Sequence, residues 1–197
     1  MEDKIAALRA HLTELSANPD FVHHKWFMKW HLELVTRIAL ELRDHYPDAD
    51  RTFVEVMALM HDYGKLLDPV NDHDPALADK GAEKLVELGF DADFAHRIAE
   101  AVKHMDRKME VDLHEAPIEV QIVSSADACS HVTGPFMYLW WYENGDKSFE
   151  ELMAGNIRKA KKDWERKVVL PEAREAFERY FDATFVQNGE LPDRFVR

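Results

Sequence analysis

Hydrophobic residues recur at intervals of three and four through most of the chain, which is the period of an amphipathic helix. Clear examples are the sets Trp30, Leu34, Val35 and Ile38; Phe53, Val54, Met57 and Met60; and Phe94, Ala95, Ile98 and Val102. Together with capping signals, this pattern predicts helices near residues 2–16, 21–45, 51–63, 75–88, 92–104, 115–130, 148–168 and 171–186. No segment alternates apolar and polar residues as a half-buried strand does, so the predicted fold class is all-α.

Capping residues mark several helix ends. Gly89 closes the fourth predicted helix, Ser148 and Glu151 form a capping box at the start of the seventh, and Pro171 opens the eighth. The chain of 197 residues contains no internal repeat, low-complexity tract or obvious linker. Its length suits one sizeable core, so we expect residues 1–197 to form a single domain.

Two segments of the C-terminal third have more than one interpretation. Residues 135–142 are apolar and aromatic but too short to span a bilayer, so they are expected to be core, a cleft wall or a contact in a homodimer. Residues 158–163 are mainly basic. Because Ile157, Ala160 and Trp164 continue an apolar stripe beneath them, we expect a solvated face. The alternative is that this basic stretch leans over a cleft and attracts phosphates.

The most informative polar residues are His61 and Asp62, which follow directly on an apolar helical run. Gly64 and Lys65 are expected to end that helix. An imidazole and a carboxylate are both metal ligands, but successive helix residues diverge by roughly 100°. Both side chains can reach one ion only if the ion lies between the directions in which they point. The other ligands must therefore come from other helices.

Two further residues have the character of such ligands. His31 lies at the edge of the buried stripe of its helix and faces inward. Asp127 ends the nearly apolar segment 118–128, where an unpaired carboxylate would be costly. A cation is therefore expected beside Asp127.

With these residues, the chain resembles the HD-domain superfamily of metal-dependent phosphohydrolases. The order of His, then His-Asp, then a distant Asp is matched by His31, by His61 and Asp62 in a His-Asp-x-Gly-Lys setting, and by Asp127. The resemblance covers about residues 24–135. It implies a compact helical bundle, with residues 136–197 as a C-terminal helical extension packed on it.

The resemblance also implies that these four residues hold a divalent metal ion. Mixed nitrogen and oxygen donors suit Mn, Fe, Co, Ni or Zn better than Mg. Dinuclear members of the superfamily place an extra histidine about four residues before the helix turn that Gly81 and Ala82 form here, and this chain has Leu77 at that position. We therefore expect one ion, unless His73 substitutes from the preceding loop.

Three residues, His104, Lys65 and Asp68, are candidates for contacts with substrate. His104 ends its helix where related phosphohydrolases often place a histidine facing the metal cleft. Lys65 could place its ammonium against a phosphate, with a solvated C-capping cation as the alternative. Asp68 lies within one loop of the metal and could act as a base. His73 lies in the polar segment 71–75 and is expected to be part of a solvated turn.

The net charge and the cysteine content restrict the binding partners and the location that we expect for this protein. A formal net charge of −13 opposes binding to extended nucleic acid, although small anions can still bind near a metal and Lys65. The first residues lack the cationic start and apolar run of a secretory signal. A single cysteine, Cys129, excludes an intramolecular disulfide and is expected to be a buried thiol. We expect a cytoplasmic protein with no membrane contact.

The sequence thus predicts a metal-dependent hydrolase of phosphoester bonds in a nucleotide or another small phosphorylated metabolite. One alternative is an iron-dependent oxygenase on the same scaffold, with His73 and His104 as added ligands. Another is a non-catalytic regulatory protein of the same superfamily that binds nucleotides.

Overall fold

The computed structural model describes residues 1–189 and residue 194, and these residues contain helices and no strand. The predicted all-α class is confirmed. The elements are α1 (Glu2–Ser16), the π-helix η1 (Met28–Leu32), α2 (Glu33–Arg43), α3 (Arg51–Met60), α4 (Tyr63–Leu67), α5 (Pro75–Glu87), α6 (Ala92–Asp106), the 3₁₀ turn η2 (Leu113–Glu115), α7 (Ile118–Val132), α8 (Phe136–Glu143), α9 (Phe149–Arg166) and α10 (Pro171–Asn188).

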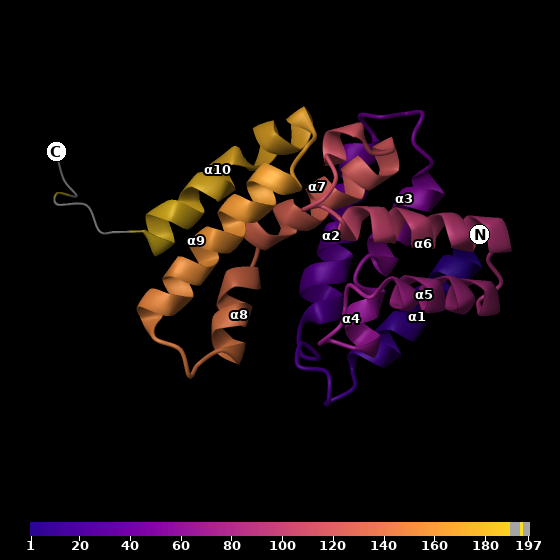
Figure 1. Ribbon diagram of the computed structural model, residues 1–197, viewed down its shortest axis with the longest axis horizontal. Coiled ribbons are helices and arrows are strands. Elements are labelled where there is room, and N and C mark those ends of the chain that lie inside the picture. The colour runs from indigo at the N-terminus through magenta and orange to yellow at the C-terminus, as the bar shows by residue number, and fades with distance from the viewer. Residues whose placement is uncertain (190–193, 195–197) are drawn as a thin grey trace.

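Helix α7 is the centre of the bundle and packs against helices from both ends of the chain. It contacts α2, α3 and α6 on one side and α8, α9 and α10 on the other (Figure 1). Almost every residue from Val120 to His131 is buried, including Ser124 and Ser125. The Ser125 hydroxyl accepts hydrogen bonds from the backbone N–H groups of Val169 and Leu170, at 3.1 and 3.3 Å. The segment that joins α9 to α10 is thereby fixed against α7.

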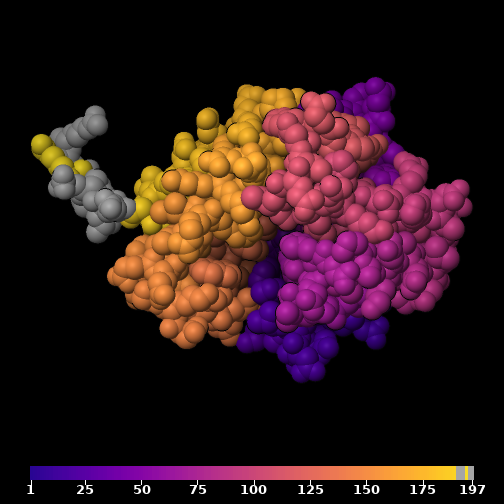
Figure 2. Space-filling model, viewed as in Figure 1, coloured from indigo at the N-terminus to yellow at the C-terminus, as the bar shows by residue number. Residues whose placement is uncertain are grey.

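The C-terminal helices form a distinct side of the molecule. Helices α9 and α10 pack against each other, and α8 lies beside α9 (Figure 1). Figure 2 shows the surface hollowed where these helices, in orange, meet the earlier part of the chain, in indigo and magenta. The predicted capping box of Ser148 and Glu151 and the proline start at Pro171 are both present.

Two predicted helices have different boundaries in the structure. The predicted helix 21–45 begins only at Met28, because turns occupy residues 17–26 and bury Phe21 and Trp26 in the core. The predicted helix 51–63 ends at Met60, and a separate short helix, α4, contains Gly64 and Lys65. Gly64 therefore does not end a helix.

Close packing explains Gly64. A Cβ atom at this position would lie 2.5 Å from the carbonyl oxygen of Asp72, a distance that no side chain tolerates. The glycine lets the loop before α5 pass directly over α4. Gly89 takes a positive φ of 86° just after α5, as a helix-ending glycine does.

Within the described part of the chain, no helix is both long enough and apolar enough to cross a bilayer. Cys129 is buried as expected, and burial raises the pKa of its thiol to about 12.

Candidate metal centre

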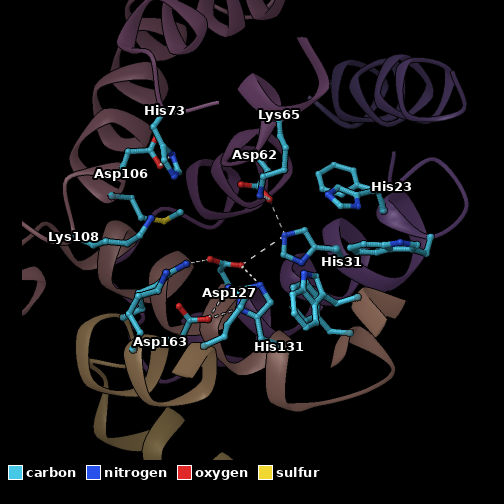
Figure 3. A pocket seen from close by; sticks show the side chains of 18 residues that line it. His23, His31, Asp62, Lys65, His73, Asp106, Lys108, Asp127, His131 and Asp163 are labelled. Carbon is cyan, nitrogen blue, oxygen red and sulfur yellow. Dashed lines mark hydrogen bonds and ion pairs between the residues drawn. The ribbon is translucent and has the colours of Figure 1, made fainter. Parts of the chain in front are cut away.

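The four residues that the sequence singled out as ligands lie together at the centre of the bundle, and Figure 3 shows His31, Asp62 and Asp127 among them. His31 belongs to η1, Asp127 to α7, and His61 and Asp62 to the junction between α3 and α4. His31 Nε2 lies 3.0 Å from Asp62 Oδ2 and 3.7 Å from Asp127 Oδ1. The break between α3 and α4 turns both members of the His-Asp pair toward the same point.

His61 provides the clearest test of whether this cluster fits a metal. Its Nδ1 lies 2.7 Å from the carbonyl oxygen of Ala58, which can only accept, so Nδ1 carries the proton and Nε2 carries a lone pair. That Nε2 is buried, and among the described residues it has no hydrogen-bond partner. It faces Asp62 Oδ2 at 3.7 Å and Asp127 Oδ1 at 3.6 Å. A lone pair directed at two carboxylates is unfavourable unless a cation lies between them, so the donors fit a metal ion.

The protonation states also suit metal binding. Burial lowers the pKa of His61 and holds the pKa of His31 well below its usual range, although Asp62 opposes both shifts. Burial would raise the pKa of Asp62, but Lys65 and the two imidazoles hold it well below its usual range. Neutral imidazoles and an ionised carboxylate are the forms that bind metals.

Two lysines neutralise the carboxylates of this cluster in the structure. Lys65 Nζ lies 2.8 Å from Asp62 Oδ2, and Lys167 Nζ forms an ion pair with Asp127 Oδ2. Burial lowers the pKa of Lys167 to about 7. Burial would also lower the pKa of Lys65, but Asp62 more than offsets this, so the pKa is raised. A divalent ion would take over the charge balance that these ammonium groups now provide.

A third imidazole, which the sequence analysis missed, completes the centre. His131 is buried, and its Nε2 lies 3.3 Å from Asp127 Oδ1. Its Nδ1 lies 2.8 Å from the buried Asp163, which also accepts from Lys159 at 2.9 Å. Burial lowers the pKa of His131 to about 4, although Asp163 opposes the shift. A carboxylate behind a neutral imidazole is the usual support of a metal-binding histidine.

The donor atoms form two overlapping groups whose members all lie within 4.8 Å of one another. One group contains His31, His61 and Asp62, and the other contains His31, Asp127 and His131. A signal for His131 was present in the sequence, since it follows Asp127 by four residues and so shares its helix face.

A cavity of about 260 Å³ opens on this cluster. Its aromatic side comprises His23, Trp26, Phe27, Phe136 and Trp140. Its charged side comprises Lys65, Asp106, Lys108, Lys159, Lys162, Asp163 and Lys167. In Figure 3, His23 and Lys108 lie on opposite sides of Asp62 and Asp127.

The structure places two of the expected substrate-contacting residues outside this cleft. His104 lies in another depression, beside Phe53 and His96, because the face of α6 that meets the cleft carries Met105 and Asp106 instead. Asp68 accepts hydrogen bonds from the backbone of Val70 and from Asn71, and so shapes its own loop. Hydrogen bonds from Asn71 lower the pKa of Asp68, which makes it a weaker base.

His73 has the exposed position expected of a turn residue, but it also reaches the rim of the cleft. Its Nδ1 lies 3.1 Å from Asp106 Oδ1, and this hydrogen bond raises its pKa. Neither His73 nor His104 belongs to the groups of potential metal ligands found among the described residues.

The basic stretch 158–163 matches the expected solvated face only in part. Arg158, Lys161 and Lys162 are exposed, but Lys159 and Lys162 also line the cleft, as the alternative interpretation expects. The helical period places residues three or four apart on one face, so only part of the stretch turns inward. In the apolar segment 135–142, Phe136 and Trp140 form a cleft wall.

Comparison with known protein families gives a match over residues 30–131 to the family described as HD domain. This range covers about half of the chain and includes all three histidines of the centre together with Asp62 and Asp127. No curated protein and no solved structure matches the chain.

Proposed function

This chain belongs to the HD-domain family, which consists mostly of metal-dependent phosphohydrolases, and we propose that it hydrolyses phosphoester bonds in a nucleotide or another small phosphorylated metabolite. The observation that carries the proposal is His61 Nε2, a buried lone pair without a partner among the described residues that faces two carboxylates. The lysines around the same cleft supply the positive charge that a phosphate requires.

We assign the metal to His31, His61, Asp62 and Asp127, with His131 as a further donor. One ion is the expected content. His31 belongs to both donor groups, and a single Nε2 lone pair can bind only one ion. When bound, a divalent ion lowers the pKa of a water molecule and neutralises charge that develops on phosphorus.

The remaining residues of the cleft bind and orient the substrate. Lys65 and Lys167, once their carboxylates are neutralised, can turn their ammonium groups toward phosphate oxygens. In the overall reaction a water oxygen bonds to phosphorus and the bond from phosphorus to the ester oxygen breaks. The proton that the water loses balances the proton that the leaving oxygen gains.

The direct test uses protein stripped with a chelator and reloaded with Mn, Fe, Co, Ni or Zn. We expect release of phosphate from a generic phosphomonoester or from members of a nucleotide panel, with no release by the stripped protein. Release that is insensitive to the chelator would contradict the proposal. Oxygen uptake by the iron-loaded protein without phosphate release would favour the oxygenase, and nucleotide binding without turnover would favour a regulatory protein.

A further inference from the structure

The cleft concentrates positive charge in a strongly acidic chain. Five lysines and four aspartates line it, whereas the whole chain has a formal net charge of −13. Three of the lysines have carboxylate partners in the cleft, in the pairs Lys65–Asp62, Lys159–Asp163 and Lys167–Asp127. Within the described residues, Lys108 and Lys162 form no ion pair.

These two unpaired lysines come from different parts of the chain but share one side of the cleft. Lys108 follows α6, and Lys162 belongs to α9. Burial lowers the pKa of Lys162, and the ammonium groups of Lys159 and Lys108 lower it further. Lys108 likewise lowers the pKa of Lys167. The ammonium groups are therefore close enough to repel one another, and an anion between them would relieve that repulsion.

A single phosphate does not account for this charge. With neutral imidazoles the lysines exceed the aspartates of the cleft by one, and a divalent ion would raise the excess to three. A phosphate group carries about 1.5 to 2 negative charges at pH 7. One phosphate on the metal, contacted by Lys65 and Lys167, would leave an excess of about one positive charge on the side of the cleft that carries Lys108 and Lys162.

We propose that Lys108 and Lys162 form a second phosphate subsite beside the metal centre, and that the preferred substrate is a nucleoside diphosphate or triphosphate. The aromatic residues of the cleft, His23 and Trp140 among them, fit the organic part of such a molecule because aromatic rings can stack with a base, and in Figure 3 His23 lies across Asp62 and Asp127 from Lys108. The substrate assignment rests on the proposed function, whereas the anion subsite can be tested without turnover.

Lys162 lies outside residues 30–131, the range that matches the family, and so do Lys159, Asp163 and Lys167. Helix α9 of the C-terminal extension would therefore supply one of the two lysines that accept the further phosphate groups, and Lys108, which lies inside the matched range, would supply the other. None of the metal-binding residues belongs to this subsite.

The experiment compares binding of inorganic triphosphate and orthophosphate to the full-length metal-loaded protein by titration calorimetry. Wild type should bind triphosphate at least about tenfold more tightly than orthophosphate. The double variant Lys108→Ala/Lys162→Ala should lose roughly tenfold in triphosphate affinity, a difference of about 1.4 kcal/mol, with little change for orthophosphate. The matched control is Lys161→Ala, which removes the same charge from α9 at an exposed position beside Phe185.

Metal content and phosphomonoester turnover are measured on the same proteins. If the double variant binds triphosphate as tightly as Lys161→Ala does, or loses affinity equally for both anions, the subsite is excluded. Retained phosphomonoester turnover in that case would leave the proposed hydrolase intact. Selective loss of triphosphate binding in a protein without turnover would support the subsite and contradict the hydrolase.

Discussion

The two sides of the cleft are built in different ways. The metal side is formed by the donors, which belong to η1, the α3–α4 junction and α7: His31, His61, Asp62, Asp127 and His131. Each imidazole there is buried, and its pKa is lowered so that it stays neutral. The lysine side takes Lys159, Lys162 and Lys167 from α9 and the residue that follows it, and Lys162 remains largely exposed to solvent. The metal side therefore provides buried lone pairs, and the lysine side provides positive charge that is partly exposed to solvent.

This difference predicts different consequences of mutation. Removing a donor from the metal side leaves an uncompensated charge or lone pair in a buried place, which should abolish metal binding. Removing a lysine from the exposed part of the other side should change substrate affinity and leave the metal in place, because exposed charges are screened by solvent. Metal content and kinetics measured on the same variants separate the two sides.

The largest effect is expected for Asp62→Ala. This change removes a carboxylate that faces both His31 and His61, so metal affinity should fall by more than about 100-fold and turnover should disappear. The helical circular dichroism should persist because the apolar core is unchanged. Asp68→Ala is the control, since Asp68 is a nearby loop carboxylate outside the cleft. Full metal content in Asp62→Ala by elemental analysis would exclude the proposed centre.

Asp163→Asn should have the next largest effect. Asp163 belongs to α9 but supports His131 on the metal side, so it connects the two sides of the cleft. Losing its charge should lower metal affinity by about 10- to 100-fold, the usual cost of removing a carboxylate behind a metal-binding histidine. The exposed residue Glu165 of the same helix provides the control Glu165→Gln. If metal affinity is unchanged and only turnover falls, His131 is not a metal ligand.

Acidification should destabilise the metal-free protein. The pKa of His131 is about 4 in the folded state and about 6.5 in the unfolded state, so the unfolded chain binds a proton first as pH falls. The stability that His131 contributes is complete above about pH 6.5 and is lost as pH falls toward 4. Between pH 7 and pH 5 the free energy of unfolding should drop by about 2 kcal/mol from this residue alone. His31 and His61, whose pKa values are also lowered, add in the same direction.

Urea denaturation of chelator-treated protein at the two pH values measures this effect. The variant His131→Gln should show a smaller drop than wild type, because the titrating imidazole is gone. An equal drop in both proteins would show that His131 is not the group that couples stability to pH.

The smallest effect is expected for Lys65→Ala. Lys65 contacts Asp62 from the edge of the metal side, and its side chain is about a quarter exposed, at 28 %. Substrate affinity should weaken by roughly tenfold, seen as a higher KM, while metal content stays near that of wild type. Lys80→Ala, an exposed lysine of α5, is the control. A large loss of metal in Lys65→Ala would mean that this lysine maintains the centre and does not bind phosphate.

Sequence alone determined most of the helical elements and four of the five donors on the metal side of the cleft, whereas helix α8 and the donor His131 were not predicted. The helical period decides locally which face of each segment is apolar, and capping residues decide where the segment begins and ends. The placement of His31 and Asp127 on buried helices could therefore be predicted. The pairing of His61 with Asp62 was equally visible, because adjacent residues leave the helix at the same place. Family resemblance supplied the order of the ligands along the chain, and the match over residues 30–131 confirms the family.

Tertiary structure decided which buried faces meet. Asp163 is 32 residues from His131 in sequence, and Lys167 is 40 residues from Asp127, so only the packing of α9 against α7 brings these pairs together. The same packing turns Lys159 and Lys162 toward the cleft. Helical period fixes directions around one axis but not the position of that axis relative to other helices. That position depends on how side chains of the whole core fill space, which no local pattern specifies.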